Sequence, residues 1–117
     1  MAARPAAPLS HRVGVTLRDG KLLPASTQAA GGRVSFAVSN SGTTTHEFVV
    51  IKTNTPAASL PVKGGKADEA GNVGETGDLA VGQSKTINLK LGAGHYVFIC
   101  NLPGHYQAGQ HSDFTVK

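Results

Sequence analysis

Apolar and polar residues alternate with a period of two along most of the chain. This alternation is typical of β-strands that bury one face. In residues 33–40, for example, Val34, Phe36 and Val38 share one face, and Asn40-Ser41-Gly42 then marks a turn. The strands predicted in this way span residues 12–19, 33–40, 46–52, 86–91, 94–100 and 111–117.

The connections between these strands suggest their neighbours. Residues 46–52 are apolar on both faces, which predicts a central strand. Gly92-Ala93-Gly94 separates two alternating segments, so we expect residues 84–91 and 94–100 to form a hairpin. The following loop, residues 101–110, should then lie at one end of the molecule and lead into the final strand.

Residues 53–77 differ from the rest, because they show little periodicity and contain many turn-forming residues. A short helical turn is possible near Pro56 to Leu60. Connections of this length in a compact domain are either functional or packed on the surface. We interpret this one as an excursion that packs on one sheet.

Together these features predict an all-β fold, an antiparallel Greek-key β-sandwich of six to eight strands with one long loop excursion. A length of 117 residues is typical of one domain. We assign that domain to residues 11–117. Residues 1–10 lack the apolar run of a signal peptide and are expected to form a flexible lead-in.

Composition narrows the possible partners. The 11 basic and 7 acidic residues give a net charge of +4, but the basic residues form no run. We interpret this charge as a solvated surface, with a weaker preference for an acidic protein partner. Nucleic-acid binding is not expected, because no basic stripe is interleaved with aromatic residues. No apolar stretch approaches the ~20 residues that span a bilayer.

The only cysteine, Cys100, excludes an internal disulfide, and a single cysteine is most often a small core residue. Its position indicates more than that. Cys100 follows Tyr96 and Phe98 on one face at the end of its strand, and His46 shares the phase of Phe48 at the start of another. Both side chains can therefore point into the same end of the sandwich.

The loop that covers this end contributes two further groups. His105 and Gln110 follow the cysteine with the spacing Cys-x4-His-x4-Gln. One thiolate with two imidazoles suits copper, and a weakly bound axial group such as Gln completes the pattern of blue copper sites. Zinc could use similar ligands, but structural zinc sites usually have more cysteines.

The residues THEFVV around His46 and the segment 96–110, YVFICNLPGHYQAGQ, resemble the cupredoxins, which are small blue copper proteins. The resemblance implies one copper ion with His46, Cys100 and His105 as equatorial ligands. Most cupredoxins place a Met axially, whereas this chain has Gln110 there and contains no methionine except Met1. That arrangement is similar to the plant stellacyanins.

The remaining polar residues near the motif receive other roles. His111 or the carbonyl of Thr45 competes with Gln110 for the axial position, although strand alternation sends His111 to the surface. His95 and His11 are also expected at the surface. Glu47 follows a ligand and occupies a position where many cupredoxins carry an Asn; we expect a surface carboxylate.

The resemblance implies an electron carrier that cycles between Cu(II) and Cu(I), and not an enzyme. Electrons are expected to leave the copper site through His105, which lies within a docking patch of small and apolar residues: Leu102, Pro103, Tyr106 and Ala108. We expect the protein to be a monomer that meets its redox-partner proteins transiently. Its expected location is the periplasm or another compartment outside the cytoplasm. Two alternatives stay open, a copper carrier or storage module and a copper enzyme in which Gln110 does not bind.

Overall fold

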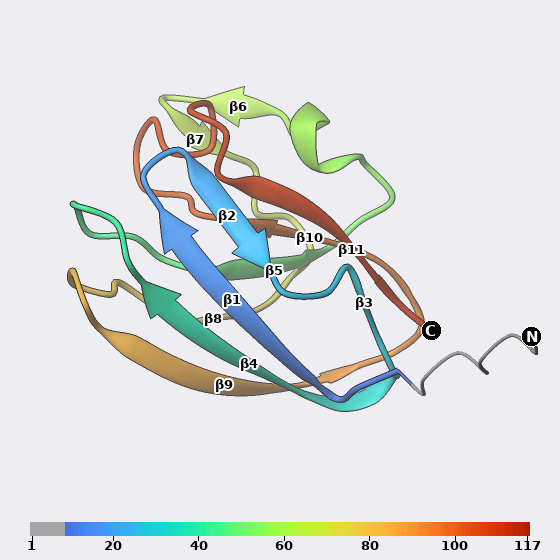
Figure 1. The fold of residues 1–117 in the computed structure, drawn as a ribbon. Helices are drawn as coiled ribbons and strands as arrows, with labels where there is room; N and C mark the ends of the chain where they lie inside the picture. The colour runs from blue at the N-terminus through green and yellow to red at the C-terminus, as the bar shows by residue number, and fades with distance from the viewer. Residues whose placement is uncertain (1–8) are drawn as a thin grey trace, which may run out of the picture.

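The computed structural model describes residues 9–117 (Figure 1). The predicted lead-in over residues 1–10 falls mostly on residues 1–8, which lie outside the described residues. The elements of the described part are β1 (Arg12–Arg18), β2 (Lys21–Pro24), β3 (Gln28–Ala29), β4 (Gly32–Asn40), β5 (Val49–Lys52), the 3-10 turn η1 (Ala57–Ser59), β6 (Val62–Lys63), β7 (Lys66–Ala67), β8 (Asn72–Glu75), β9 (Ser84–Leu91), β10 (Gly94–Ile99) and β11 (His111–Val116).

The strands form two main sheets that face each other, so the predicted β-sandwich is confirmed (Figure 1). One sheet has the order β2-β1-β4-β9, and the other has the order β3-β11-β10-β5-β8. A separate hairpin pairs β6 with β7. The described part has eleven strands because short segments add to the six that alternation predicts. None of its helices is long and apolar enough to cross a membrane.

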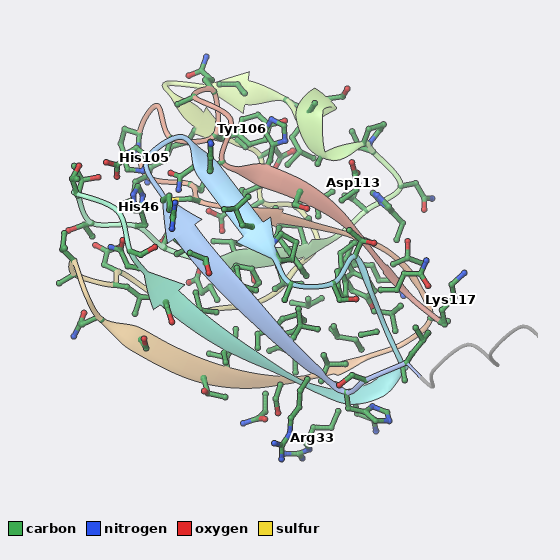
Figure 2. All side chains as sticks on the ribbon, in the orientation of Figure 1. Arg33, His46, His105, Tyr106, Asp113 and Lys117 are labelled. Carbon is green, nitrogen blue, oxygen red and sulfur yellow. The ribbon has the colours of Figure 1, made fainter. Side chains whose placement is uncertain are left out.

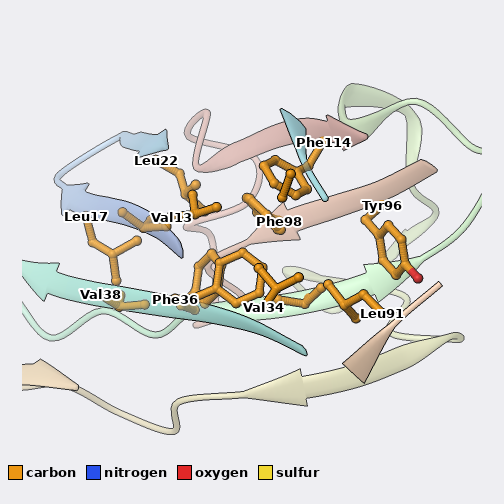
Figure 3. Packing of buried hydrophobic residues seen from close by; sticks show 14 of the residues in the cluster. Val13, Leu17, Leu22, Val34, Phe36, Val38, Leu91, Tyr96, Phe98 and Phe114 are labelled. Atoms are coloured by element: carbon orange, nitrogen blue, oxygen red, sulfur yellow. The ribbon is translucent and has the colours of Figure 1, made fainter. Parts of the chain in front are cut away.

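The alternating residues form the main core between the two sheets (Figure 3). Phe36 of β4 lies at its centre and contacts three other phenyl rings, with centroid distances of 5.5 Å to Phe48, 5.4 Å to Phe98 and 6.0 Å to Phe114. Aromatic pairs at such distances add stabilisation beyond the burial of their area. The period-two pattern therefore identified the core-facing residues correctly.

The excursion between β5 and β9 covers the outer face of the second sheet. Ala57, Leu60 and Ala67 pack on a second buried cluster that contains Val97 and Ile99 of β10. The predicted helical turn is present as η1, and packing on one sheet is confirmed. The excursion also supplies β8, an edge strand beside β5 that its sequence pattern did not indicate.

Two predictions about strand pairing are wrong. The first is the hairpin of residues 84–91 and 94–100, because β9 pairs with β4 and β10 pairs with β5 and β11. Residues 96–99 of β10 are buried on both faces, and a strand of that kind lies between two partners inside a sheet. Strand β9 is largely exposed on one face and takes the edge beside β4. Residues 92 and 93 therefore connect the two sheets.

The second wrong prediction is that all strands are antiparallel. β1 and β4 are parallel, as are β3 and β11. After β2 the chain crosses to the second sheet as β3 and then returns as β4. Parallel neighbours need a crossover of this kind, whereas antiparallel neighbours need only a hairpin.

Candidate metal centre

His46 is fixed just before β5 by backbone and side-chain hydrogen bonds. Its N–H donates to the carbonyl of Leu79 at 3.2 Å, and its carbonyl accepts from the N–H of Leu79 at 2.8 Å. The preceding loop is tied by Asn40, whose amide donates to the carbonyls of Thr44 and Leu79 at 2.9 Å and accepts from the N–H of Gly42. The His46 side chain is only 1% exposed.

Cys100 directly follows β10 and is fully buried. The Cys100 N–H donates to the carbonyl of Gln110 at 3.1 Å, which closes the loop between them. The N–H of Glu47 donates to the Cys100 Sγ at 3.3 Å, so the segment that carries His46 also contacts the sulfur. Backbone pairing thus fixes the thiol relative to both neighbouring segments.

The loop 101–110 is held by its own turns and by the β6–β7 hairpin. The N–H of His105 donates to the carbonyl of Leu102 at 2.9 Å, and the N–H of Gly104 donates to the carbonyl of Gly65 at 2.8 Å. The side chain of Asn101 pairs with both backbone groups of Ala67. These contacts place His105 over the end of the sandwich.

Three donor atoms converge there, from His46, Cys100 and His105. The Nδ1 atoms of His46 and His105 are 3.1 Å apart, and the Cys100 Sγ lies 3.8 Å from the first and 3.4 Å from the second. All three atoms fall within 4.8 Å of one another. Figure 2 shows both histidines at one end of the sandwich and Lys117 toward the other.

Gln110 lines a pocket together with His46, His105 and Ala108. Its amide nitrogen donates to the carbonyls of Arg18 at 2.8 Å and Lys21 at 3.1 Å. Because two carbonyl acceptors require the NH2 end, these contacts fix the orientation of the amide. Among the buried side-chain N and O atoms of residues 9–117, Gln110 Oε1 is the one without a hydrogen-bond partner.

The donor set and this unpartnered oxygen fit a copper ion. A buried oxygen without a partner is costly unless something else binds it. Burial raises the pKa of the Cys100 thiol, since apolar surroundings disfavour the thiolate. A bound cation would provide the positive charge that the thiolate needs, as metal binding generally does for its ligands.

The structure separates the other predicted residues from this cluster. His111 lies at the start of β11 with its ring 5.2 Å from that of Tyr106, outside the three-residue donor cluster. His95 hydrogen-bonds the carbonyl of Thr53 at 2.5 Å and Asp113 at 2.9 Å. His11 is exposed.

Two predicted surface residues are less exposed than expected. Tyr106 is buried: its hydroxyl donates to the carbonyl of Ala57 and accepts from the N–H of Leu60. It therefore cannot belong to a docking patch, and its inclusion there was wrong. Glu47 is half-buried, and its pKa is raised first by burial and then by nearby carboxylates, among them Glu69.

Sequence reasoning missed two residues that support the centre. The sequence pattern assigned Asn40 to the turn at residues 40–42 and Asp19 to the end of the strand at residues 12–19. Asp19 Oδ1 lies 2.8 Å from the Nε2 of His46. The sequence pattern shows only that both residues favour turns, because their hydrogen-bond partners lie far away along the chain.

A two-sheet sandwich with a buried thiol and two converging imidazoles at one end defines the class of blue copper proteins. The profile of the cupredoxin-like domain family matches residues 1–111 of the chain. The chain therefore belongs to the cupredoxin-like family. Family and donor cluster together support one copper ion as the cofactor. Among curated protein sequences, none matches the chain.

Several solved structures share the fold. Auracyanin from the photosynthetic bacterium Roseiflexus castenholzii superposes with a TM-score of 0.72 at 22% identity, covering 93% of this chain and 98% of auracyanin. Auracyanin A, a "blue" copper protein from Chloroflexus aurantiacus, gives 0.61 at 20% identity and covers 89% and 99%. Rusticyanin from Thiobacillus ferrooxidans gives 0.68 at 19% identity and covers 91% and 76%.

Proposed function

We propose that the protein is an electron carrier whose copper ion is held by His46, Cys100 and His105, with Gln110 as a weak axial ligand. The observation that carries this proposal is the convergence of one thiol and two Nδ1 atoms. The axial role of Gln110 is supported by its unpartnered buried oxygen and by its place beside His46 and His105 in one pocket. Copper held by such donors would cycle between Cu(II) and Cu(I).

The protein's part in this reaction is to keep its donors in place. His46 and Gln110 are almost fully buried, and the loops that carry them are tied by backbone and amide hydrogen bonds. Donors with so little freedom move little when the charge at the centre changes. As an axial ligand, Gln110 Oε1 would fill the position that an open enzyme site leaves for substrate, which favours a carrier over an enzyme.

Electrons would enter and leave through His105, the one ligand that is only half-buried. Pro103 and Ala108 are exposed beside it, and Leu102 is half-buried. These three residues form the revised docking patch, without Tyr106. The tip of the β6–β7 hairpin extends it, since the carbonyl of Gly65 binds the N–H of Gly104. Transient redox complexes use interfaces below about 1,200 Å².

Transient protein partners and a location outside the cytoplasm are part of the same proposal. They are supported by membership in the cupredoxin-like family and by the likeness of the fold to auracyanin and rusticyanin. We expect the carrier to act as a monomer.

The function is tested by loading the protein with Cu(II) and recording visible absorption and voltammetry on one sample. An electron carrier should show an intense thiolate-to-Cu(II) band and a reversible one-electron couple, with copper retained over repeated cycles. A copper carrier or storage module would instead lose Cu(I) to a competing chelator after reduction. His111→Ala is the matched control, since that residue lies outside the donor cluster.

A further inference from the structure

Asp19 contacts the far side of a proposed copper ligand. Its Oδ1 lies 2.8 Å from the Nε2 of His46, while the Nδ1 of the same ring faces Cys100 and His105. When Nδ1 binds a metal, the neutral imidazole carries its proton on Nε2. The Nε2–H group then donates a hydrogen bond to the Asp19 carboxylate.

The carboxylate is itself held in place and ionised. The N–H of Thr43 donates to both oxygens of Asp19, at 3.0 and 3.1 Å, and the Thr43 hydroxyl donates to Oδ2. A carboxylate that accepts these hydrogen bonds is ionised at neutral pH. Asp19 is 46% exposed, whereas His46 is 1% exposed, so the pair links the buried ring to the surface.

The turn that carries Asp19 also holds Gln110, the proposed axial ligand. Its flanking residues, Arg18 and Lys21, accept both hydrogen bonds from the amide nitrogen of Gln110. Gly20 has a φ of 73°, in the region that favours glycine. One β1–β2 turn therefore contacts two of the four proposed ligands, although Gln110 lies about 90 positions further along the chain.

We propose that Asp19 is a positioning residue of the copper centre, which fixes the tautomer and ring orientation of His46 and adds a negative charge that favours Cu(II). This proposal rests on the proposed function. Outer carboxylates that accept from a ligating imidazole raise its basicity, and their loss typically costs 10–100-fold in metal affinity. The charge acts more strongly on Cu(II) than on Cu(I), so it lowers the reduction potential.

Gly42 lies directly beside this contact. A Cβ atom at Gly42 would lie 2.5 Å from Asp19 Oδ1 and 2.7 Å from His46 Nε2. Real Cβ atoms essentially never approach neighbours so closely. A side chain at position 42 therefore requires the carboxylate, the imidazole or the loop to shift, so Gly42→Ala is expected to disturb this contact.

The test compares Asp19→Asn and Gly42→Ala with Asp113→Asn. Asp113 is a suitable control because it is also an exposed carboxylate on a histidine, His95 Nε2 at 2.9 Å, outside the donor cluster. We expect Asp19→Asn to keep the blue band but to weaken Cu(II) binding about tenfold more than Cu(I) binding. That ratio raises the potential by about 59 mV. Gly42→Ala should shift the potential in the same direction, and Asp113→Asn should not shift it.

A second readout concerns the bond itself. In the diamagnetic Cu(I) protein, the Nε2 proton of His46 should exchange slowly with water and give an observable NMR signal. Asp19→Ala should abolish that signal, because the acceptor is lost. The proposal is overturned if both Asp19 variants match Asp113→Asn in potential and in proton exchange. A parent protein without a blue band would instead contradict the proposed function, so the two failures are distinguishable.

Discussion

The Nδ1 of His46 lies 3.8 Å from the Sγ of Cys100, although the two residues are 54 positions apart in the chain. The antiparallel pairing of β5 with β10, in which Val49 faces Ile99, brings their segments to the same end of one sheet. Sheet hydrogen bonds and the apolar core therefore create this proximity. We therefore expect His46 and Cys100 to lie close together in the metal-free protein as well.

Metal-free protein should accordingly unfold in one cooperative transition. Removing the central ring with Phe36→Ala should lower the free energy of unfolding by about 3–5 kcal/mol, since it leaves a cavity among three phenyl rings. Val81→Ala, at a residue that is 57% exposed, should change it by less than about 0.5 kcal/mol. Chemical denaturation followed by circular dichroism measures both changes. A non-cooperative transition of the metal-free protein would show that the apolar core does not hold the fold together without copper.

Copper should add to this stability by mass action, because it binds the native site more tightly than the unfolded chain. Its removal with a chelator should lower the melting temperature of the parent protein. The same treatment should leave the melting temperature of Cys100→Ser nearly unchanged. Equal shifts in the two proteins would show that copper binds elsewhere.

Gln110→Met should raise the reduction potential, because an amide oxygen is a harder ligand than a thioether and favours Cu(II). A tenfold change in the ratio of the two copper affinities corresponds to about 59 mV. The same change removes both hydrogen bonds to the carbonyls of Arg18 and Lys21. Metal-free Gln110→Met should therefore also lose about 1–3 kcal/mol of stability.

Voltammetry of Gln110→Met, Gln110→Ala and His111→Ala decides the axial assignment. We expect both Gln110 variants to differ from the parent protein and His111→Ala to match it. Unchanged potentials in both Gln110 variants, with a shift in His111→Ala, would assign the axial role to the histidine.

Tyr106→Phe should lower stability without changing the potential. The hydroxyl makes two buried hydrogen bonds, to Ala57 and from Leu60, and its loss leaves both backbone groups without their partner. A cost of about 1–3 kcal/mol is expected. Tyr96→Phe is the matched control, since that hydroxyl makes one bond, to the carbonyl of Gly92. A smaller loss in Tyr106→Phe than in Tyr96→Phe would contradict this role.

Much of the fold could be predicted from local pattern. Strand alternation assigned Phe36 and Phe98 to the core, and phase with spacing brought His46 and Cys100 to one end of the sandwich. These inferences succeed because the side-chain direction in a strand depends only on position along it. The same reasoning identified the excursion as a segment packed on one sheet.

What local pattern could not predict depends on distant partners. The placement of β9 beside β4 follows from which sheet edge is free, and the burial of Tyr106 follows from the path of residues 57–60. Asp19 and Asn40 read as turn residues because their roles depend on His46 and Leu79. Such contacts exist only once the two sheets have assembled.

Cu(II) titration of the parent protein and of Cys100→Ser, followed by visible absorption, tests the copper centre most directly. We expect an intense thiolate-to-Cu(II) band that saturates at one copper per chain in the parent protein and is absent in Cys100→Ser. The same band in Cys100→Ser, or its absence from the parent protein, would contradict the assignment of His46, Cys100 and His105 as a copper centre.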